Sequence, residues 1–142
     1  MALNEETGYA AKSWQRFDET VTNEIVRAMV SAFALVAAAD GDLAAEEVER
    51  FGVLLKQQAG PLAPLPIEGV DSAFADVVAA LLSDPEGSRA RALRIIEALR
   101  GDEPYSELIV AVAQIALKAD HHERAEEFAA MKDIRAALGL AA

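Results

Sequence analysis

The 142-residue chain contains no cysteine, so disulfide bonds and thiolate metal sites are excluded. Aromatic residues make up only 6% of a chain that is 53% hydrophobic, so alanine and the aliphatic side chains must fill the core. Basic residues are also few, and 13 Lys and Arg against 24 Asp and Glu give a net charge of −11. Because nucleic-acid binding rests on Lys and Arg neutralising phosphates, we exclude that class of partner. The charge instead favours attraction to cations or to a basic patch on another protein.

Long apolar runs are missing as well. No run reaches the roughly 20 residues that a membrane-spanning helix needs, so we expect no membrane insertion. Residues 1–6 lack the basic start and apolar core of a secretory signal peptide, which favours a cytoplasmic location. The length suits one domain, residues 1–142, with a sizeable core.

The composition and the helical spacing of apolar residues predict an all-α, single-domain bundle of about seven helices. Ala10, Trp14, Phe17 and Val21, for example, form one apolar stripe of the first helix. The expected helices cover about residues 4–18, 22–39, 43–58 and 71–82, then a fifth from Pro85 up to Gly101, a sixth from near Pro104 to about Ala119, and a seventh over 123–138.

Two of these helices are almost wholly apolar. From Ala28 to Ala39 only Ser31 is polar, and from Leu108 to Leu117 only Gln114 is polar. A helix that is hydrophobic on all sides belongs in the middle of a bundle. We therefore expect both helices to be central and buried.

The ends of the later helices carry specific signals. Asp84 followed by Pro85 is a favoured start for a helix, and Gly101 and Gly139 are typical stop signals. The inward face expected for the last helix consists of Phe128, Met131 and Ile134.

An acidic turn occurs twice, at residues 40–47 and at residues 120–127, and each copy follows one of the two apolar helices. Core positions on both sides agree, since Leu35 corresponds to Ile115 and Phe51 to Met131. Two copies are too few for a solenoid. The pattern predicts a pseudo-twofold pair of helix–turn–helix units within one bundle.

The first turn partly matches a calcium-binding EF-hand loop. Asp40, Gly41 and Glu47 would fill positions five, six and twelve of such a loop. Positions one and three would fall on Val36 and Ala38, which offer no side-chain oxygen. A complete EF-hand is therefore excluded.

Three roles remain open for the acids of the two turns. They can stabilise helix starts, as Asp42 would do as a cap, because the helix dipole favours negative charge there. They can dock a basic partner protein, or they can supply the hard oxygen ligands that calcium and magnesium prefer, whereas zinc is less favoured. The candidate metal ligands are Asp40, Asp42, Glu47, Asp120 and Glu127.

Other chemistry finds little support. His121 and His122 are the only histidines, and His122 with Glu126 falls short of the three or four ligands of a zinc site. The chain has no His-Glu-x-x-His or Gly-x-Ser-x-Gly motif and no glycine-rich phosphate loop. We therefore expect a protein that is not an enzyme.

On these residues the chain resembles the TerB tellurite-resistance family. The resemblance covers about residues 20–140 and is carried by the apolar run Ala34–Ala39 with Asp40-Gly41 and Glu47, and by the second copy with Asp120 and Glu127. It implies an all-helical fold of about seven helices and a role in stress response. It also implies a divalent cation held by an acidic cluster, here Asp40, Glu47, Asp120 and Glu127. The second copy departs from the pattern at His121, where the first has Gly41.

Overall fold

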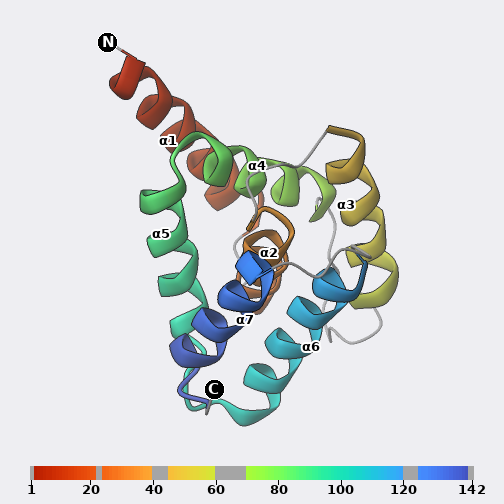
Figure 1. Ribbon diagram of the computed structural model, residues 1–142. Coiled ribbons are helices and arrows are strands. Elements are labelled where there is room, and N and C mark those ends of the chain that lie inside the picture. Colours follow the sequence, from red (N-terminus) through yellow and green to blue (C-terminus); the bar gives the residue numbers. More distant parts are fainter. Residues whose placement is uncertain (1, 22–23, 40–44, 60–69, 120–124, 141–142) are drawn as a thin grey trace.

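The computed structural model describes residues 2–21, 24–39, 45–59, 70–119 and 125–140. These residues form seven α-helices and no strand, so the predicted all-α fold is confirmed (Figure 1). The helices are α1 (Ala2–Thr20), α2 (Glu24–Ala37), α3 (Ala45–Ala59), α4 (Val70–Ser83), α5 (Pro85–Glu97), α6 (Glu103–Ala119) and α7 (Ala125–Ala137).

The apolar helix α2 occupies the centre of the bundle, as its sequence predicts. Every side chain from Ala28 to Ala37 is buried, and α4, α5, α6 and α7 all contact the helix. The Phe33 ring meets the rings of Phe51 and Phe74 edge to face, with centroids 5.7 and 5.3 Å apart. These contacts fix α2 against α3 and α4.

The second apolar helix, α6, is buried on one side only. Ile109, Val112 and Ala116 are buried where α6 packs along α2. Val110, Gln114, Ile115 and Leu117 are only half-buried, because α3 and α7 cover the rest of the helix incompletely. The expectation of a fully buried α6 is therefore wrong for this outer part of the helix.

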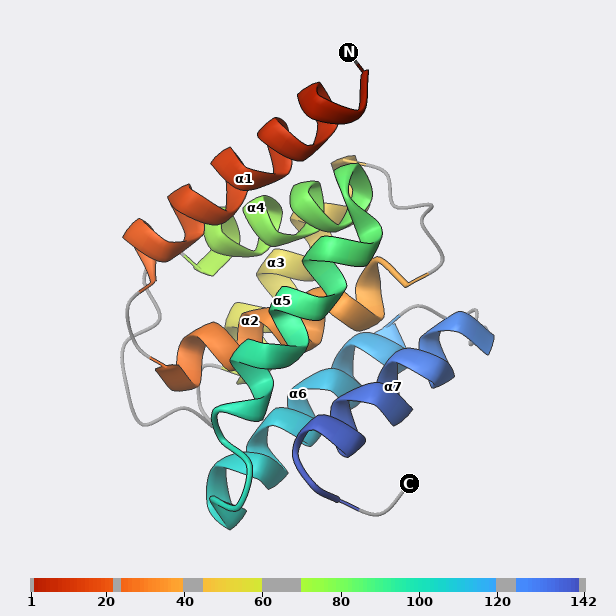
Figure 2. The same cartoon turned by 90° about the vertical axis from the view of Figure 1, so that its left-hand side faces the viewer.

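An outer helix, α1, lies across α4 (Figure 2). The predicted core stripe is confirmed, since Ala10, Trp14, Phe17 and Val21 are all buried. The Trp14 ring packs edge to face on Phe17 with centroids 5.5 Å apart. Its indole N–H donates a 3.1 Å hydrogen bond to the Ser88 hydroxyl, which links α1 to α5.

Asp18 connects α1 to two other helices. Its carboxylate oxygens lie 2.7 Å from Arg27 of α2 and 2.7 Å from Arg91 of α5. Each guanidinium also lies over an aromatic ring of α1: Arg27 is 4.8 Å from the centroid of Phe17 and Arg91 is 5.1 Å from that of Trp14. The cluster places two cations where both a carboxylate and a ring face attract them.

The predicted signals at the helix ends are confirmed. Asp84 caps α5, its side chain accepting a 3.4 Å hydrogen bond from the Gly87 amide, with Pro85 in the first turn. Gly101 and Gly139 adopt φ values of 87° and 76° after α5 and α7. A side chain would strain both positions, which explains why glycine ends these segments.

The inward face of α7 differs from the expected one at a single residue. Met131 and Ile134 are buried as predicted, together with Glu127 and Leu138. Phe128 is 51% exposed, so its assignment to the core is wrong. Consecutive helical residues point about 100° apart, so a face centred on Glu127, Met131 and Ile134 turns Phe128 outward.

Two further predictions concern the internal repeat and membrane insertion. The pseudo-twofold repeat stays a prediction, because each acidic turn lies largely outside the described residues. Among the helices that the structure describes, none is both long and apolar enough to cross a membrane.

Candidate cation site at the starts of α3 and α7

Helices α3 and α7 begin in the same way. The first residue of each is alanine, and the next two are glutamates: Glu46 and Glu47 in α3, Glu126 and Glu127 in α7. Carboxylates in a first turn lie near the positive end of the helix dipole, which stabilises their negative charge. Both acidic turns therefore deliver two carboxylates to a helix start.

The two glutamates of each pair have different surroundings. Glu46 and Glu126 are exposed, whereas Glu47 is half-buried and Glu127 is only 2% exposed. The third residue of each helix thus points toward the bundle while the second points to solvent. In α7 this follows from the inward face, because Glu127 precedes the buried Met131 by one helical turn.

A glutamate at the third position can act in two ways. It can reach back and accept a hydrogen bond from the amide of the residue before the helix, as in a capping box. It can also contribute oxygen ligands to a cation held by the preceding turn. Both carboxylate oxygens of Glu127 are buried, so solvent does not solvate this group as it does Glu126.

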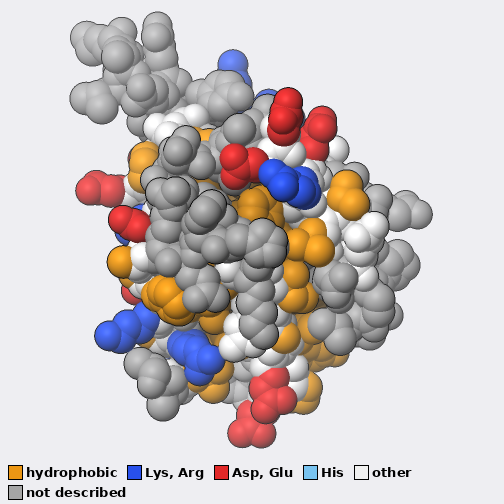
Figure 3. All heavy atoms as spheres, turned by 45° about the vertical axis from the view of Figure 1, so that its right-hand side comes forward, with side chains coloured by type: hydrophobic (Ala, Val, Ile, Leu, Met, Phe, Trp, Pro, Cys, Tyr) orange, Lys and Arg blue, Asp and Glu red, His pale blue; other side chains and the backbone are white. Residues whose placement is uncertain are grey.

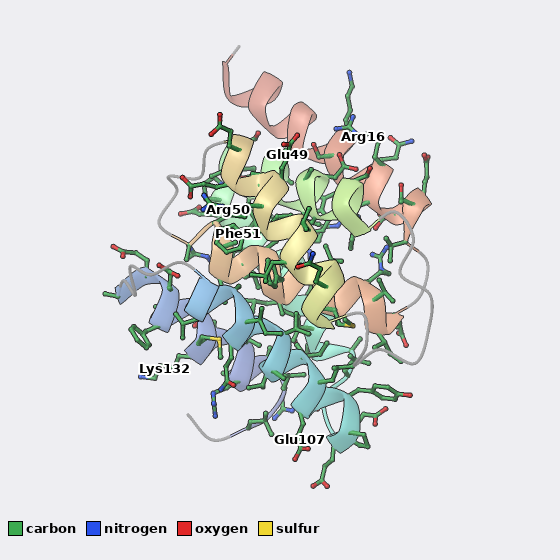
Figure 4. All side chains as sticks on the ribbon, turned by 90° about the vertical axis from the view of Figure 1, so that its right-hand side faces the viewer. Arg16, Glu49, Arg50, Phe51, Glu107 and Lys132 are labelled. Atoms are coloured by element: carbon green, nitrogen blue, oxygen red, sulfur yellow. The ribbon has the colours of Figure 1, made fainter. Side chains whose placement is uncertain are left out.

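The structure does not bring the two described candidate ligands together. Helix α3 packs on α4 and α6, whereas α7 packs on α2, α5 and α6, and Figures 1 and 4 both show the first turns of α3 and α7 well apart. Glu47 and Glu127 therefore belong to separate turns. Asp40, Asp42 and Asp120, like both histidines, lie outside the described residues.

The donor chemistry of the described residues fits part of a cation site. Calcium takes six to eight oxygen ligands and magnesium about six, and a single carboxylate supplies at most two. Within the part of the chain that the structure describes, no group of three His, Asp or Glu side chains could hold a metal. The sequence offers Asp120, in the turn before α7, as a further candidate ligand for a site at Glu127, and Asp120 lies outside the described residues.

A hollow of about 130 Å³ lies between α2, α5 and α7, beside the exposed glutamate of α7. Its charged lining residues are Arg89, Glu126 and Asp133, and its floor is aliphatic, with Leu35 and Leu93. The described lining includes no Ser, Thr, Cys or His, so it offers neither a hydroxyl or thiol nucleophile nor an imidazole base. Sequence reasoning missed this hollow because its residues come from three separate helices.

The chain matches no protein-family model, and no curated protein or solved structure is significantly similar to it. The resemblance to TerB therefore stays a prediction from the sequence. Any function has to be argued from the residues themselves.

Proposed function

We propose that this chain is a non-enzymatic, TerB-like stress-response domain that binds a divalent cation at its acidic turns. The observation that supports the proposal is the burial of Glu127. The helix dipole already stabilises an exposed carboxylate such as that of Glu126, so the dipole does not by itself require that the neighbouring Glu127 be buried. Burying a carboxylate is costly unless hydrogen bonds or a metal compensate it.

Calcium or magnesium is the proposed ion. The candidate ligands are carboxylates, which are hard oxygen donors, and the cysteine thiolates that favour zinc are absent from the chain. A bound cation would offset negative charge on a chain of net charge −11 and tie the turn before α7 to the bundle. Because the ion would bind the folded state, it would stabilise that state.

Capping is the competing role for Glu127, and one substitution separates the two. Glutamine also serves at the third position of a capping box, because its amide oxygen can accept the same hydrogen bond. It carries no charge and is a much weaker ligand for calcium or magnesium. Glu127→Gln therefore preserves capping and removes cation binding, and Glu126→Gln is the matched control on the exposed neighbour.

The experiment is a set of thermal melts of the metal-free protein with calcium, magnesium or zinc at millimolar concentration. An ion at 100 times its dissociation constant stabilises by about 2.7 kcal/mol, which raises the melting temperature by several degrees. We expect this rise in melting temperature with calcium or magnesium for the parent chain and for Glu126→Gln, and we expect it to be absent for Glu127→Gln. Absence of a shift with every ion, or a full shift in Glu127→Gln, would refute the proposal.

A further inference from the structure

A groove of about 380 Å³ runs between α6 and α7, on the side of α7 that faces away from α5. Its floor is apolar and its outer edge is basic. The residues that line it are Gln114, Leu117, Phe128, Met131, Lys132 and Arg135. One wall is the half-buried edge of α6, with Gln114 and Leu117. The other wall is the side of α7 that carries Phe128, Lys132 and Arg135, next to the buried Met131.

Phe128 makes this groove unusual on the described surface. Phe128 is 51% exposed and lies beside the half-buried Leu117 and the buried Met131. A large aromatic side chain next to other apolar groups at the surface typically marks a contact with another molecule. Aromatic residues are also among those that contribute most to protein–protein binding.

The outer edge of the groove is positively charged, although the chain as a whole is acidic. Lys132 and Arg135 lie on the Phe128 side of α7, whereas Glu126 and Asp133 lie on the opposite side with Arg89. Among the described residues, neither Lys132 nor Arg135 pairs with a carboxylate. In the view of Figure 3, Lys and Arg side chains lie next to hydrophobic ones at the lower left of the surface.

Glu107, an acidic residue of α6, is not among the described residues that line the groove. Figure 4 shows Lys132 extending outward from α7, whereas Glu107 lies toward the other end of α6. At physiological ionic strength charges are screened beyond about 8 Å, so Lys132 and Arg135, which line the groove, act on a ligand there more strongly than Glu107 does.

We propose that this groove binds an amphipathic helix of a partner protein, with apolar anchor residues flanked by Asp or Glu. Helices α6 and α7 lie side by side, and a groove between two helices suits a third helix that inserts residues spaced three and four apart. The anchors would contact Phe128, Leu117 and Met131, and the acidic flanks would meet Lys132 and Arg135. The inference does not depend on cation binding at the acidic turns.

A pair of synthetic peptides tests the proposal. The first is a fluorescein-labelled helical peptide of about four turns with leucines at i, i+4 and i+7 and flanking glutamates. The second is identical except that lysines replace the glutamates. Fluorescence anisotropy with the full chain, in the presence of EDTA, should show binding of the acidic peptide that weakens as salt increases. The lysine peptide should bind at least about tenfold more weakly.

Matched variants locate the binding site. Phe128→Ala should weaken binding of the acidic peptide about tenfold or more, as expected for a central aromatic contact. Its control is Val53→Ala on α3, since Val53 is 50% exposed and Phe128 is 51% exposed. The double variant Lys132→Glu with Arg135→Glu should reverse the preference in favour of the lysine peptide, and Arg50→Glu on α3 should leave it unchanged. Melting curves of all variants establish that they are folded.

Three results would overturn the inference. One is equal affinity for the two peptides, and another is binding of the acidic peptide that Phe128→Ala leaves unchanged. The third is self-association of the parent chain, measured by sedimentation, that Phe128→Ala abolishes. That result would assign the groove to a second copy of the chain.

Discussion

Helices α2 and α6 are built from similar residues but have different surroundings. Each has an apolar run interrupted by one polar residue, Ser31 in α2 and Gln114 in α6. α4, α5, α6 and α7 pack along α2, and every side chain from Ala28 to Ala37 is buried. α6 packs on α2, α3 and α7, and its outer edge stays half-exposed.

The difference shows that the arrangement of neighbours decides the burial of an apolar helix, while its composition only permits burial. At the outer edge of α6, Leu117, which is the kind of residue that is buried in α2, lines one wall of a groove. Phe128 of α7 lines the other wall. The same kind of sequence therefore serves packing in one place and a surface for binding in another.

The largest expected effect contrasts two phenylalanines. Phe33 of α2 is fully buried between Phe51 and Phe74, so Phe33→Ala should destabilise the fold by about 3–5 kcal/mol. Phe128→Ala should change stability by less than about 0.5 kcal/mol, because the ring is already half in solvent. Urea denaturation of both variants gives the two values. Similar losses would show that Phe128 is a core residue.

A smaller effect is expected from the same substitution in the two apolar helices. Val30 of α2 is fully buried, so Val30→Ala should cost about 2 kcal/mol, from lost apolar burial and the cavity left behind. Val110 of α6 is half-buried, and Val110→Ala should cost less than about 1 kcal/mol. Denaturation midpoints measured at one temperature compare them. A larger loss for Val110 would contradict the unequal burial.

The smallest effect, with the opposite sign, is expected at the two polar residues. The Ser31 hydroxyl is buried and has no hydrogen-bond partner among the described residues, so Ser31→Ala should stabilise the protein by about 1 kcal/mol. Gln114 lies at the half-exposed edge, and Gln114→Ala should change stability by less than about 0.5 kcal/mol. Thermal melts resolve the sign. A destabilised Ser31→Ala variant would mean that the hydroxyl makes a hydrogen bond in solution.

Much of the fold follows from local sequence. The spacing of Ala10, Trp14, Phe17 and Val21 identifies the buried side of α1, and the Asp84-Pro85 pair marks the start of α5. These features depend on residues close together in the chain. They could be predicted because periodicity and capping act within a few turns.

Features that depend on tertiary placement could not be predicted. In α7, Glu127 and Phe128 are adjacent, and hydrophobicity alone assigns the phenylalanine to the core. In the structure Glu127 is the buried residue and Phe128 is exposed. The orientation of α7 about its axis decides this, and that orientation depends on how α7 packs on α2 and α6. The separation of Glu47 from Glu127 likewise follows from tertiary packing, because α3 packs on α4 whereas α7 packs on α5, and the internal repeat does not specify this.

The most direct test of the proposed function is calorimetric titration of the metal-free chain with calcium and, separately, with magnesium. Saturable binding of at least one ion is expected for the parent chain and for Glu126→Gln, with little or no binding by a folded Glu127→Gln variant. If neither ion binds the parent chain, or if Glu127→Gln binds as tightly as the parent, the buried glutamate serves to cap α7 and the cation site does not exist.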